Sequence, residues 1–333
     1  MKTNKGASRR AVLGGIAVVA GSLALPSIAR AAEKTVRLGH VFPIDHPVHV
    51  GVEKAAAAIE QRSNGQFKIK LFPSAQLGAS KDLVQQVSDG SLDIVVDGPG
   101  MLGNWHRPVS ILEAPFIPRD WAQLVRMIEG QWVQSQFEQM ATKNSIRVFG
   151  QPWYSGQRHL TTRDREVRKL SDAARLKIRV PEIPVFLDMI RAIGATPTPM
   201  ALPEVYLGLK TGIADGQENP LATIYAQKFH EVQGVLNLSG HITSVMLACM
   251  SEKTWSGLDD SGRAAFVAAF NDGGDASTNR MNELEGSLQK TLRDAGMKVV
   301  QTDRVEFQAA MEPVYKKNAA VWGEGVVQQL QAL

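Results

Sequence analysis

Cysteine is nearly absent from this 333-residue sequence, which contains only Cys249. A single cysteine excludes an internal disulfide. Cys249 lies in the apolar run VMLACM, where a free cysteine is typical of a buried core residue. Low-complexity runs are also absent, and hydrophobic residues make up an ordinary 44% of the chain. A globular chain of this length predicts two domains.

Long apolar runs are absent after residue 31, so no later segment is expected to cross a bilayer. Before it, Arg9 and Arg10 precede the modest apolar run 11–25, and Ala29 and Ala31 form an A-x-A cleavage pattern. This order predicts a twin-arginine signal peptide over 1–31, cleaved near Ala31, and export to the periplasm. The alternative, an N-terminal membrane anchor, is disfavoured because the run is short.

An excess of positive charge is also missing once that segment is set aside. The whole chain has 37 Lys and Arg against 33 Asp and Glu, but residues 1–31 hold five of those cations and no acid. The remainder has 32 cations and 33 acids, a net charge of −1. Nothing in this balance indicates a nucleic-acid partner.

Recognisable catalytic, cofactor and metal motifs are missing as well. No G-x-S-x-G nucleophile motif occurs, and the Asp and Glu residues form no recognisable acid/base pair. His46 and His49 lack a carboxylate or further histidine at ligand spacing and are expected on a surface loop. Gly98, Gly100 and Gly103 match G-x-G-x-x-G, but no helical pattern follows, so a glycine-rich loop is expected instead of a dinucleotide site. We therefore expect no metal and no cofactor.

Alternating strand and helix patterns predict α/β architecture with parallel sheet. Strands are expected over 35–42, 67–72, 92–96, 176–180 and 297–302, and helices over 49–63, 78–90, 183–194, 203–212 and 306–322. Residues 259–296 are also helical in pattern, with Met281, Leu284, Leu288 and Leu292 on one face. Gly273 and Gly274 interrupt this pattern and predict two helices there.

Two parts of the chain echo each other. KIKLFP (68–73) resembles KIRVP (177–181), and QQVSDGSLD (85–93) resembles LGLKTGIAD (207–215). The echo is compatible with two similarly built lobes. It is equally compatible with generic corners, because αβ connections converge on a glycine that caps the helix.

A polar cluster lies between two apolar segments in TGIADGQENPLATI, residues 211–224. Asp215, Gln217, Glu218 and Asn219 fall within five positions and are followed by Pro220. The cluster comes where a buried strand is expected to end, and ligand clefts of α/β lobes form at such ends.

Arg179 lies in the strand LKIRV, on the face opposite Leu176, Ile178 and Val180. That face could be solvated, but both faces of a parallel sheet are normally covered. A covered arginine needs an anion, and a guanidinium matches the two oxygens of a carboxylate. Arg158 is a second candidate, with Trp153 and Tyr154 close by in sequence. Asn219 could donate its amide to the same anion.

At these residues the chain resembles the substrate-binding proteins of tripartite ATP-independent periplasmic (TRAP) transporters, the C4-dicarboxylate-type solute receptor family. The segments that carry this resemblance are KIRVP, GATPTPM, EVY and DGQENP, in that order, with QLG, DGSLDI and APFIPRD before them. It covers nearly all of the chain after the signal segment. It implies a two-lobed periplasmic-binding-protein fold, with a mixed sheet flanked by helices in each lobe and a ligand cleft between lobes.

The resemblance also implies roles for particular residues. Arg179 and Asn219 are expected to bind the substrate carboxylate, helped by Arg158. An aromatic wall residue that family members often carry is replaced here by Leu202. The lobes are expected over 32–156 plus about 244–283, and over 157–243 plus about 284–333.

What the resemblance implies for function is capture of a small organic acid, without catalysis, for the small and large membrane subunits of a permease driven by an ion gradient. Asp97, Glu182 and Gln217 are candidate partners for ligand hydroxyls, although such loop residues often only meet water. They favour a sugar acid such as a uronate or aldonate. Trp153 and Tyr154 would suit an aromatic acid, and keto and dicarboxylic acids stay open. An exported enzyme acting on small acids, or a protein that presents its ligand to a sensor, are alternatives. A monomer is expected.

Overall fold

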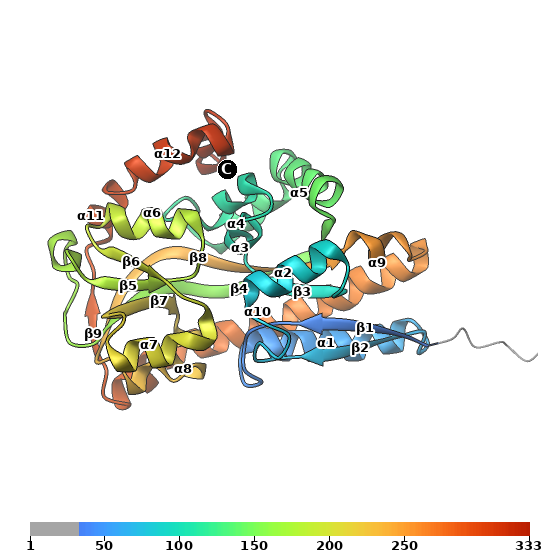
Figure 1. The fold of residues 1–333 in the computed structure, drawn as a ribbon, viewed down its shortest axis with the longest axis horizontal. Helices are drawn as coiled ribbons and strands as arrows, with labels where there is room; N and C mark the ends of the chain where they lie inside the picture. The colour runs from blue at the N-terminus through green and yellow to red at the C-terminus, as the bar shows by residue number, and fades with distance from the viewer. Residues whose placement is uncertain (1–32) are drawn as a thin grey trace, which may run out of the picture. The chain divides into compact units, whose positions relative to one another are not determined.

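Nine strands form one mixed sheet in residues 33–333, the part of the chain that the structure, a computed structural model, describes (Figure 1). The predicted signal peptide lies outside the described residues. The strands are β1 (Lys34–Gly39), β2 (Phe67–Phe72), β3 (Ile94–Asp97), β4 (Ile146–Thr162), β5 (Lys177–Val180), β6 (Thr196–Pro199), β7 (Gly216–Pro220), β8 (Val235–Ser251) and β9 (Lys298–Gln301). Their spatial order is β2-β1-β3-β8-β4-β7-β5-β6, and β9 pairs with β8.

Helices flank this sheet on both sides, as the mixed α/β prediction required (Figure 1). The α-helices are α1 (Pro47–Arg62), α2 (Ser80–Asp89), α3 (Pro99–Leu102), α4 (Trp121–Glu129), α5 (Gln131–Asn144), α6 (Pro184–Ala192), α7 (Val205–Thr211), α8 (Leu221–Ala226), α9 (Glu252–Ser256), α10 (Asp260–Asp294), α11 (Arg304–Ala309), α12 (Glu312–Trp322) and α13 (Val326–Gln331). Short 3₁₀ turns are η1 (Arg107–Glu113), η2 (Leu170–Ala173), η3 (Leu202–Glu204) and η4 (Phe229–Glu231). Among residues 33–333, no helix has both the length and the apolar character of a membrane span.

The two halves of the sheet are built alike. The chain runs β1-α1-β2-α2-β3 in one half and β5-α6-β6-α7-β7 in the other, and each triplet has its first strand in the middle. The segments 85–93 and 207–215 lie at equivalent places in the two halves, where α2 and α7 both end on a left-handed glycine, Gly90 and Gly212. The glycine cap by itself is equally explained by ordinary helix capping. The proposed match of 68–73 (in β2) with 177–181 (in β5) was wrong. By its place in the sheet β5 corresponds to β1, because both are middle strands, whereas β2 is an edge strand.

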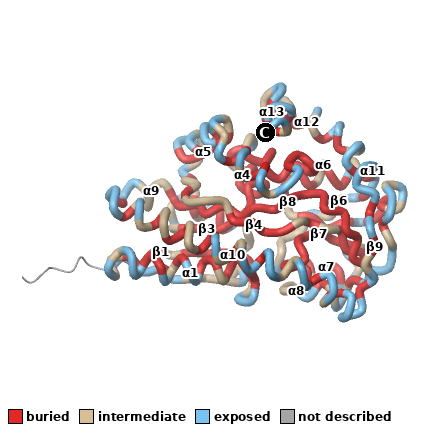
Figure 2. Tube along the Cα trace, turned by 180° about the vertical axis from the view of Figure 1, so that it is seen from behind, coloured by how far each residue is buried: buried red, intermediate tan, exposed pale blue. Residues whose placement is uncertain are grey.

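Strands β4 and β8 join the two halves, since each is 17 residues long and they pair antiparallel along their length. Every residue of β8 is buried, including Cys249 as predicted. Figure 2 shows the buried residues following these central strands. The predicted lobe boundaries at 156 and 244 fall inside β4 and β8, and the boundary at 283 falls inside α10. The two lobes therefore stay a prediction within one compact unit of residues 33–333.

The prediction of two helices over 259–296 was wrong, because α10 is one helix of 35 residues. Gly273 and Gly274 do not break it; they let it approach α1 and β4. A Cβ on Gly273 would lie 2.6 Å from the carbonyl oxygen of Gly51, and a Cβ on Gly274 would lie 2.6 Å from the ring of Trp153. In the opposite sense, the single helix expected over 306–322 is two helices, α11 and α12, with Pro313 in the first turn of α12.

We predict opposite effects for two glycine substitutions in α10. Gly273→Ala should destabilise the protein by about 1–3 kcal/mol, because the new methyl group meets the backbone of α1. Gly286→Ala, at an exposed site with nothing within 4 Å of the new Cβ, should stabilise it by about 0.5–1 kcal/mol through helix propensity. Urea denaturation measures both. Equal effects would show that Gly273 has no packing role.

Candidate functional site

A cavity of about 350 Å³ opens where strands of both halves end. Asp97 ends β3, Arg179 and Pro181 come from the end of β5, and Asn219 and Pro220 end β7. The crossing strands β4 and β8 add Ser155, Arg158 and Met246. Ligand sites of α/β sheets form at such carboxyl ends, because the chain leaves the sheet there and exposes polar groups.

Arg179 is the charged group at one side of this cavity. Its side chain is 2% exposed, and its Nε and Nη2 atoms donate to the carbonyl oxygen of Met200 at 3.0 and 2.6 Å. No carboxylate lies within ion-pair distance of it in residues 33–333. Burial lowers the pKa of Arg179 to about 9, opposed by the negative charge of Glu218, so the group is still a cation at neutral pH. Arg179 is thus a buried positive charge that lines the cavity.

Arg158 is equally buried but already neutralised. Its Nε and Nη2 atoms donate to the two carboxylate oxygens of Glu218 at 2.5 and 2.8 Å, and His241 Nε2 lies 3.2 Å from the same carboxylate. Burial alone would raise the pKa of Glu218, but Arg158 overrides it and holds this pKa below its usual value. Losing one member of such a pair would leave a buried charge uncompensated, a cost of about 3–5 kcal/mol.

Asn219 lies between the two arginines and is held in place from behind. Its Oδ1 atom accepts from Arg158 Nη2 at 3.1 Å, and its Nδ2 atom donates to Gln217 Oε1 at 2.5 Å. Gln217 in turn donates to Thr161 Oγ1 at 2.9 Å. One hydrogen of the Asn219 amide is left for the cavity, because an amide nitrogen carries two.

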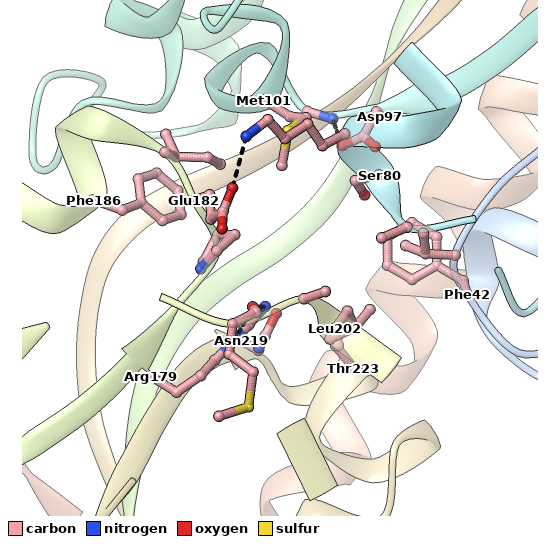
Figure 3. A pocket seen from close by; sticks show the side chains of 18 of the residues that line it. Phe42, Ser80, Asp97, Met101, Arg179, Glu182, Phe186, Leu202, Asn219 and Thr223 are labelled. Atoms are coloured by element: carbon pink, nitrogen blue, oxygen red, sulfur yellow. Dashed lines mark hydrogen bonds and ion pairs between the residues drawn. The ribbon is translucent and has the colours of Figure 1, made fainter. Parts of the chain in front are cut away.

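Two carboxyl groups form the other side of the cavity. Figure 3 shows Asp97 and Ser80 across from Arg179 and Asn219. Asp97 is half-buried and accepts from the Gly98 amide at 2.8 Å, and burial raises its pKa to about 6. Glu113 accepts from the Gly100 amide at 2.9 Å and from Ser244 Oγ at 3.1 Å. Burial raises the pKa of Glu113 to about 7, opposed mainly by the positive charge of Arg158.

An exposed ion pair bridges the two halves beside the cavity. Lys81 Nζ of α2 lies 2.8 Å from Glu182 Oε2, which follows β5 (Figure 3). The backbone carbonyl of Glu182 also accepts from Asn104 Nδ2 at 3.1 Å. The apolar walls come from Phe42, Met101, Phe186 and Leu202. Leu202 is the residue that stands where family members often carry an aromatic side chain. Apolar walls with a few convergent polar groups are the ordinary make-up of a small-molecule site.

Six of the nine residues proposed from sequence line this cavity: Arg179, Asn219, Arg158, Asp97, Glu182 and Leu202. The other three do not. Trp153 is fully buried against Phe270, and the Tyr154 hydroxyl donates to Glu285 Oε2 at 2.8 Å. Both side chains contact α10, because this part of β4 packs on that helix. Closeness to Arg158 in sequence was therefore a wrong guide to their position. Gln217 contacts the site only through Asn219.

Two other predictions near the cavity need correction. His46 and His49 are buried, not on a loop surface, because His46 caps α1 and His49 Nδ1 lies 3.0 Å from His40 Nε2. No cluster of metal-binding side chains occurs among residues 33–333. The loop at Gly98 and Gly100 starts the four-residue helix α3, and its glycines give room to Glu113: a Cβ on either would lie 2.7 Å from Glu113 Oε2.

Sequence reasoning missed Glu113, Ser155 and Thr223, which also line the cavity. Glu113 lies in a 3₁₀ turn, and Thr223 lies one helical turn after Asn219 in an apolar-looking helix. The acidic residue in the apolar run SILEAPF was a usable signal, because a glutamate in such a run must find buried partners. Ser155 carried no signal of its own.

Comparison with known proteins assigns the family. Residues 38–320 match the model of DctP, the bacterial extracellular solute-binding protein family 7. The chain belongs to this family of solute-binding proteins.

Individual relatives agree over nearly the whole chain. It is 34% identical to the sialic acid-binding periplasmic protein of Vibrio cholerae, over 91% of this chain and 94% of that protein. A TRAP periplasmic solute-binding protein from Polaromonas sp. bound to D-erythronate is 32% identical, with a TM-score of 0.86, covering 90% of this chain and 99% of that one. One from Roseobacter denitrificans with bound L-galactonate is 28% identical, with a TM-score of 0.85, covering 91% and 99%.

We predict that Glu113 makes stability fall as pH rises from 5 to 7.5. Its pKa is raised from 4.5 to about 7, so in this window the folded protein holds a proton that the unfolded chain has released. The free energy of unfolding should drop by up to about 3 kcal/mol, and Asp97 adds to the drop with the same sign.

Urea denaturation of Glu113→Gln at both pH values checks this. The variant should lose most of the pH dependence, while Glu129→Gln, at an exposed position of α4, should keep it. A Glu113→Gln protein with the wild-type pH profile would show that Glu113 does not carry the effect.

Proposed function

We propose that this protein captures a small hydroxylated organic acid, such as an aldonate or uronate, in the periplasm and delivers it to the membrane subunits of a TRAP permease driven by an ion gradient. One observation carries the proposal: the buried Arg179 cation faces a cavity and has no carboxylate partner among residues 33–333. A bound carboxylate would compensate that charge, and a guanidinium matches two carboxylate oxygens.

The atoms left free around Arg179 define how the carboxylate would be held. The Nη1 atom of Arg179 has no hydrogen-bond partner in the described residues, and neither does the Nη1 atom of Arg158. The free hydrogen of the Asn219 amide adds a third donor. Arg158 adds little net charge because Glu218 neutralises it, so Arg179 supplies the charge and its neighbours supply direction.

The far side of the cavity favours hydroxyl groups on the ligand. With pKa values of about 6 and 7, Asp97 is mostly ionised and Glu113 partly ionised at neutral pH. Their ionised forms accept hydrogen bonds in the cavity and would repel the second carboxylate of a dicarboxylic acid. They would also find no donor on a plain keto acid. Trp153 and Tyr154, which had suggested an aromatic acid, lie outside the cavity lining.

Relatives with known ligands support the same class. The solved structures similar to this chain include proteins bound to D-erythronate, L-galactonate, β-D-galacturonate and L-fuconate. Each of these ligands is a sugar acid. Because this chain belongs to the same family, we propose that its ligand is also a sugar acid. Experiment must identify the particular acid.

We predict that Arg179→Met raises the dissociation constant for the bound acid at least about 100-fold, because charged hydrogen bonds contribute about 1.5–3 kcal/mol each. Its thermal midpoint without ligand should change little, because loss of the two hydrogen bonds to the Met200 carbonyl is offset by removal of a buried charge that no carboxylate pairs with in residues 33–333. Asn219→Ala should weaken binding only about 5–10-fold, since one neutral donor is removed.

Calorimetry with the refolded protein and a panel of aldonates, uronates, keto acids, dicarboxylates and aromatic acids measures this. Arg163→Met is the matched control, because Arg163 also donates to a backbone carbonyl, that of Leu209, but lies outside the cavity. Wild-type affinity in Arg179→Met would refute the anchor. A folded wild type that binds no acid would refute the function.

A further inference from the structure

Two buried hydroxyl groups on the cavity wall have hydrogen-bond donors that no described residue uses. Ser155 of β4 is 1% exposed, and its Oγ atom has no hydrogen-bond partner in residues 33–333. Thr223 of α8 is 2% exposed, and among residues 33–333 the one hydrogen-bond contact of its side chain is with His46. Buried hydroxyl hydrogens without an acceptor are rare in folded proteins. Ser155 and Thr223 also line the cavity, unlike Ser277, so a bound ligand could supply the acceptor.

His46 fixes which way the Thr223 hydroxyl can point. The Nδ1 atom of His46 accepts from the Val48 amide at 3.2 Å, as the cap of α1. Burial, followed by the effect of His40, lowers the pKa of His46 to about 3, so the ring is neutral. Its one proton is therefore on Nε2, which donates to Thr223 Oγ1 at 3.1 Å. Thr223 already accepts from His46, and its own hydrogen is left to donate into the cavity.

Ser155 lies at a break in β4 and lines the same cavity as Thr223. The pairing of β4 with β8 shifts between Tyr154 and Gln157, and Gly156 has a φ of +92°. That left-handed backbone lets the strand pass close to the start of α8: a Cβ on Gly156 would lie 3.1 Å from Pro220 Cβ. Thr223 lies beside Asn219 and Leu202 in Figure 3. The two free donors thus come from elements that flank the Asn219–Pro220 turn.

We propose that Ser155 and Thr223 are specificity-determining residues that donate hydrogen bonds to ligand oxygens other than the anchored carboxylate. The inference rests on the proposed function and deepens it. Asp97 and Glu113 can accept, Thr223 is left to donate, and Ser155 can donate or accept. A hydroxyl group is suited to both because it accepts and donates at once, whereas a keto oxygen only accepts and an ammonium group only donates. The wall therefore selects polyhydroxy acids, and His46 is a positioning residue for Thr223.

The test compares hydroxylated acids with alkanoates of the same length. D-erythronate, L-galactonate and D-galacturonate are titrated into the refolded protein, beside butyrate and hexanoate, and the tightest hydroxylated probe is kept. Ser155→Ala and Thr223→Val should each weaken binding of that probe about 5–10-fold. Neither should weaken binding of the alkanoate, which has no oxygen for these donors.

Matched controls separate this effect from packing and from the anchor. Ser277→Ala removes another fully buried hydroxyl without a partner in residues 33–333, but outside the cavity, and should leave all affinities unchanged. Arg179→Met should abolish binding of both kinds of acid. Equal loss for hydroxylated acid and alkanoate in Ser155→Ala and Thr223→Val would overturn the inference, as would no loss. A wild-type protein that binds alkanoates but none of the hydroxylated acids would overturn this inference, whereas the proposal that the protein binds an organic acid would stand.

A double-mutant cycle tests the positioning by His46. His46→Asn keeps a side-chain cap for α1 but is too short to reach Thr223. It should weaken binding of the hydroxylated probe in the wild-type background, because the Thr223 hydroxyl is no longer oriented. It should have no further effect in Thr223→Val, which lacks the hydroxyl that His46 orients. Additive losses would show that His46 does not act through Thr223.

Discussion

A buried guanidinium group without a carboxylate partner is the interaction on which the site of this protein depends. Arg179 and Arg158 are both almost fully buried, but Glu218 neutralises only Arg158. The Met200 carbonyl oxygen holds Arg179 in place without cancelling its charge. Because a buried charge is costly until it is paired, Arg179 favours binding of an anion in the cavity, and the nearby Glu218 is already paired with Arg158.

The repeated architecture explains how one cavity acquires two opposite sides. In the β1–β3 pairing Gly39 lies opposite Val95, and in the β5–β7 pairing Arg179 lies opposite Gln217. Two residues further along these strands, β3 ends on Asp97 and β7 reaches Asn219. Equivalent positions of two similar halves thus carry an acceptor on one side and donors on the other. A ligand with a carboxylate at one end and hydroxyl groups at the other matches this division.

Much of the fold could be predicted because it follows from local patterns. Apolar periodicity located β1, β2, β3 and β5 and the helices of both halves, and glycines at 90 and 212 marked helix ends. It missed β6 and β7, because β7 is the polar cluster itself and has no apolar alternation. Distant contacts decided what the patterns could not. Gly273 and Gly274 looked like helix breakers, yet the close approach of α1 and Trp153 keeps α10 continuous. Trp153 and Tyr154 looked like site residues, yet their side chains pack toward α10.

The sequence by itself determined the class of protein, because KIRVP and DGQENP carry the resemblance to its family, and it supplied Arg179 and Asn219 as candidates for the anchor. Only the tertiary structure decided which charges are available. Three contacts show this: Arg158 with Glu218, Glu113 with Ser244, and His46 with Thr223. Each joins residues at least 60 positions apart in the sequence. Such contacts decide whether a polar side chain bonds within the protein or keeps a donor or acceptor for a ligand, and local sequence does not specify them.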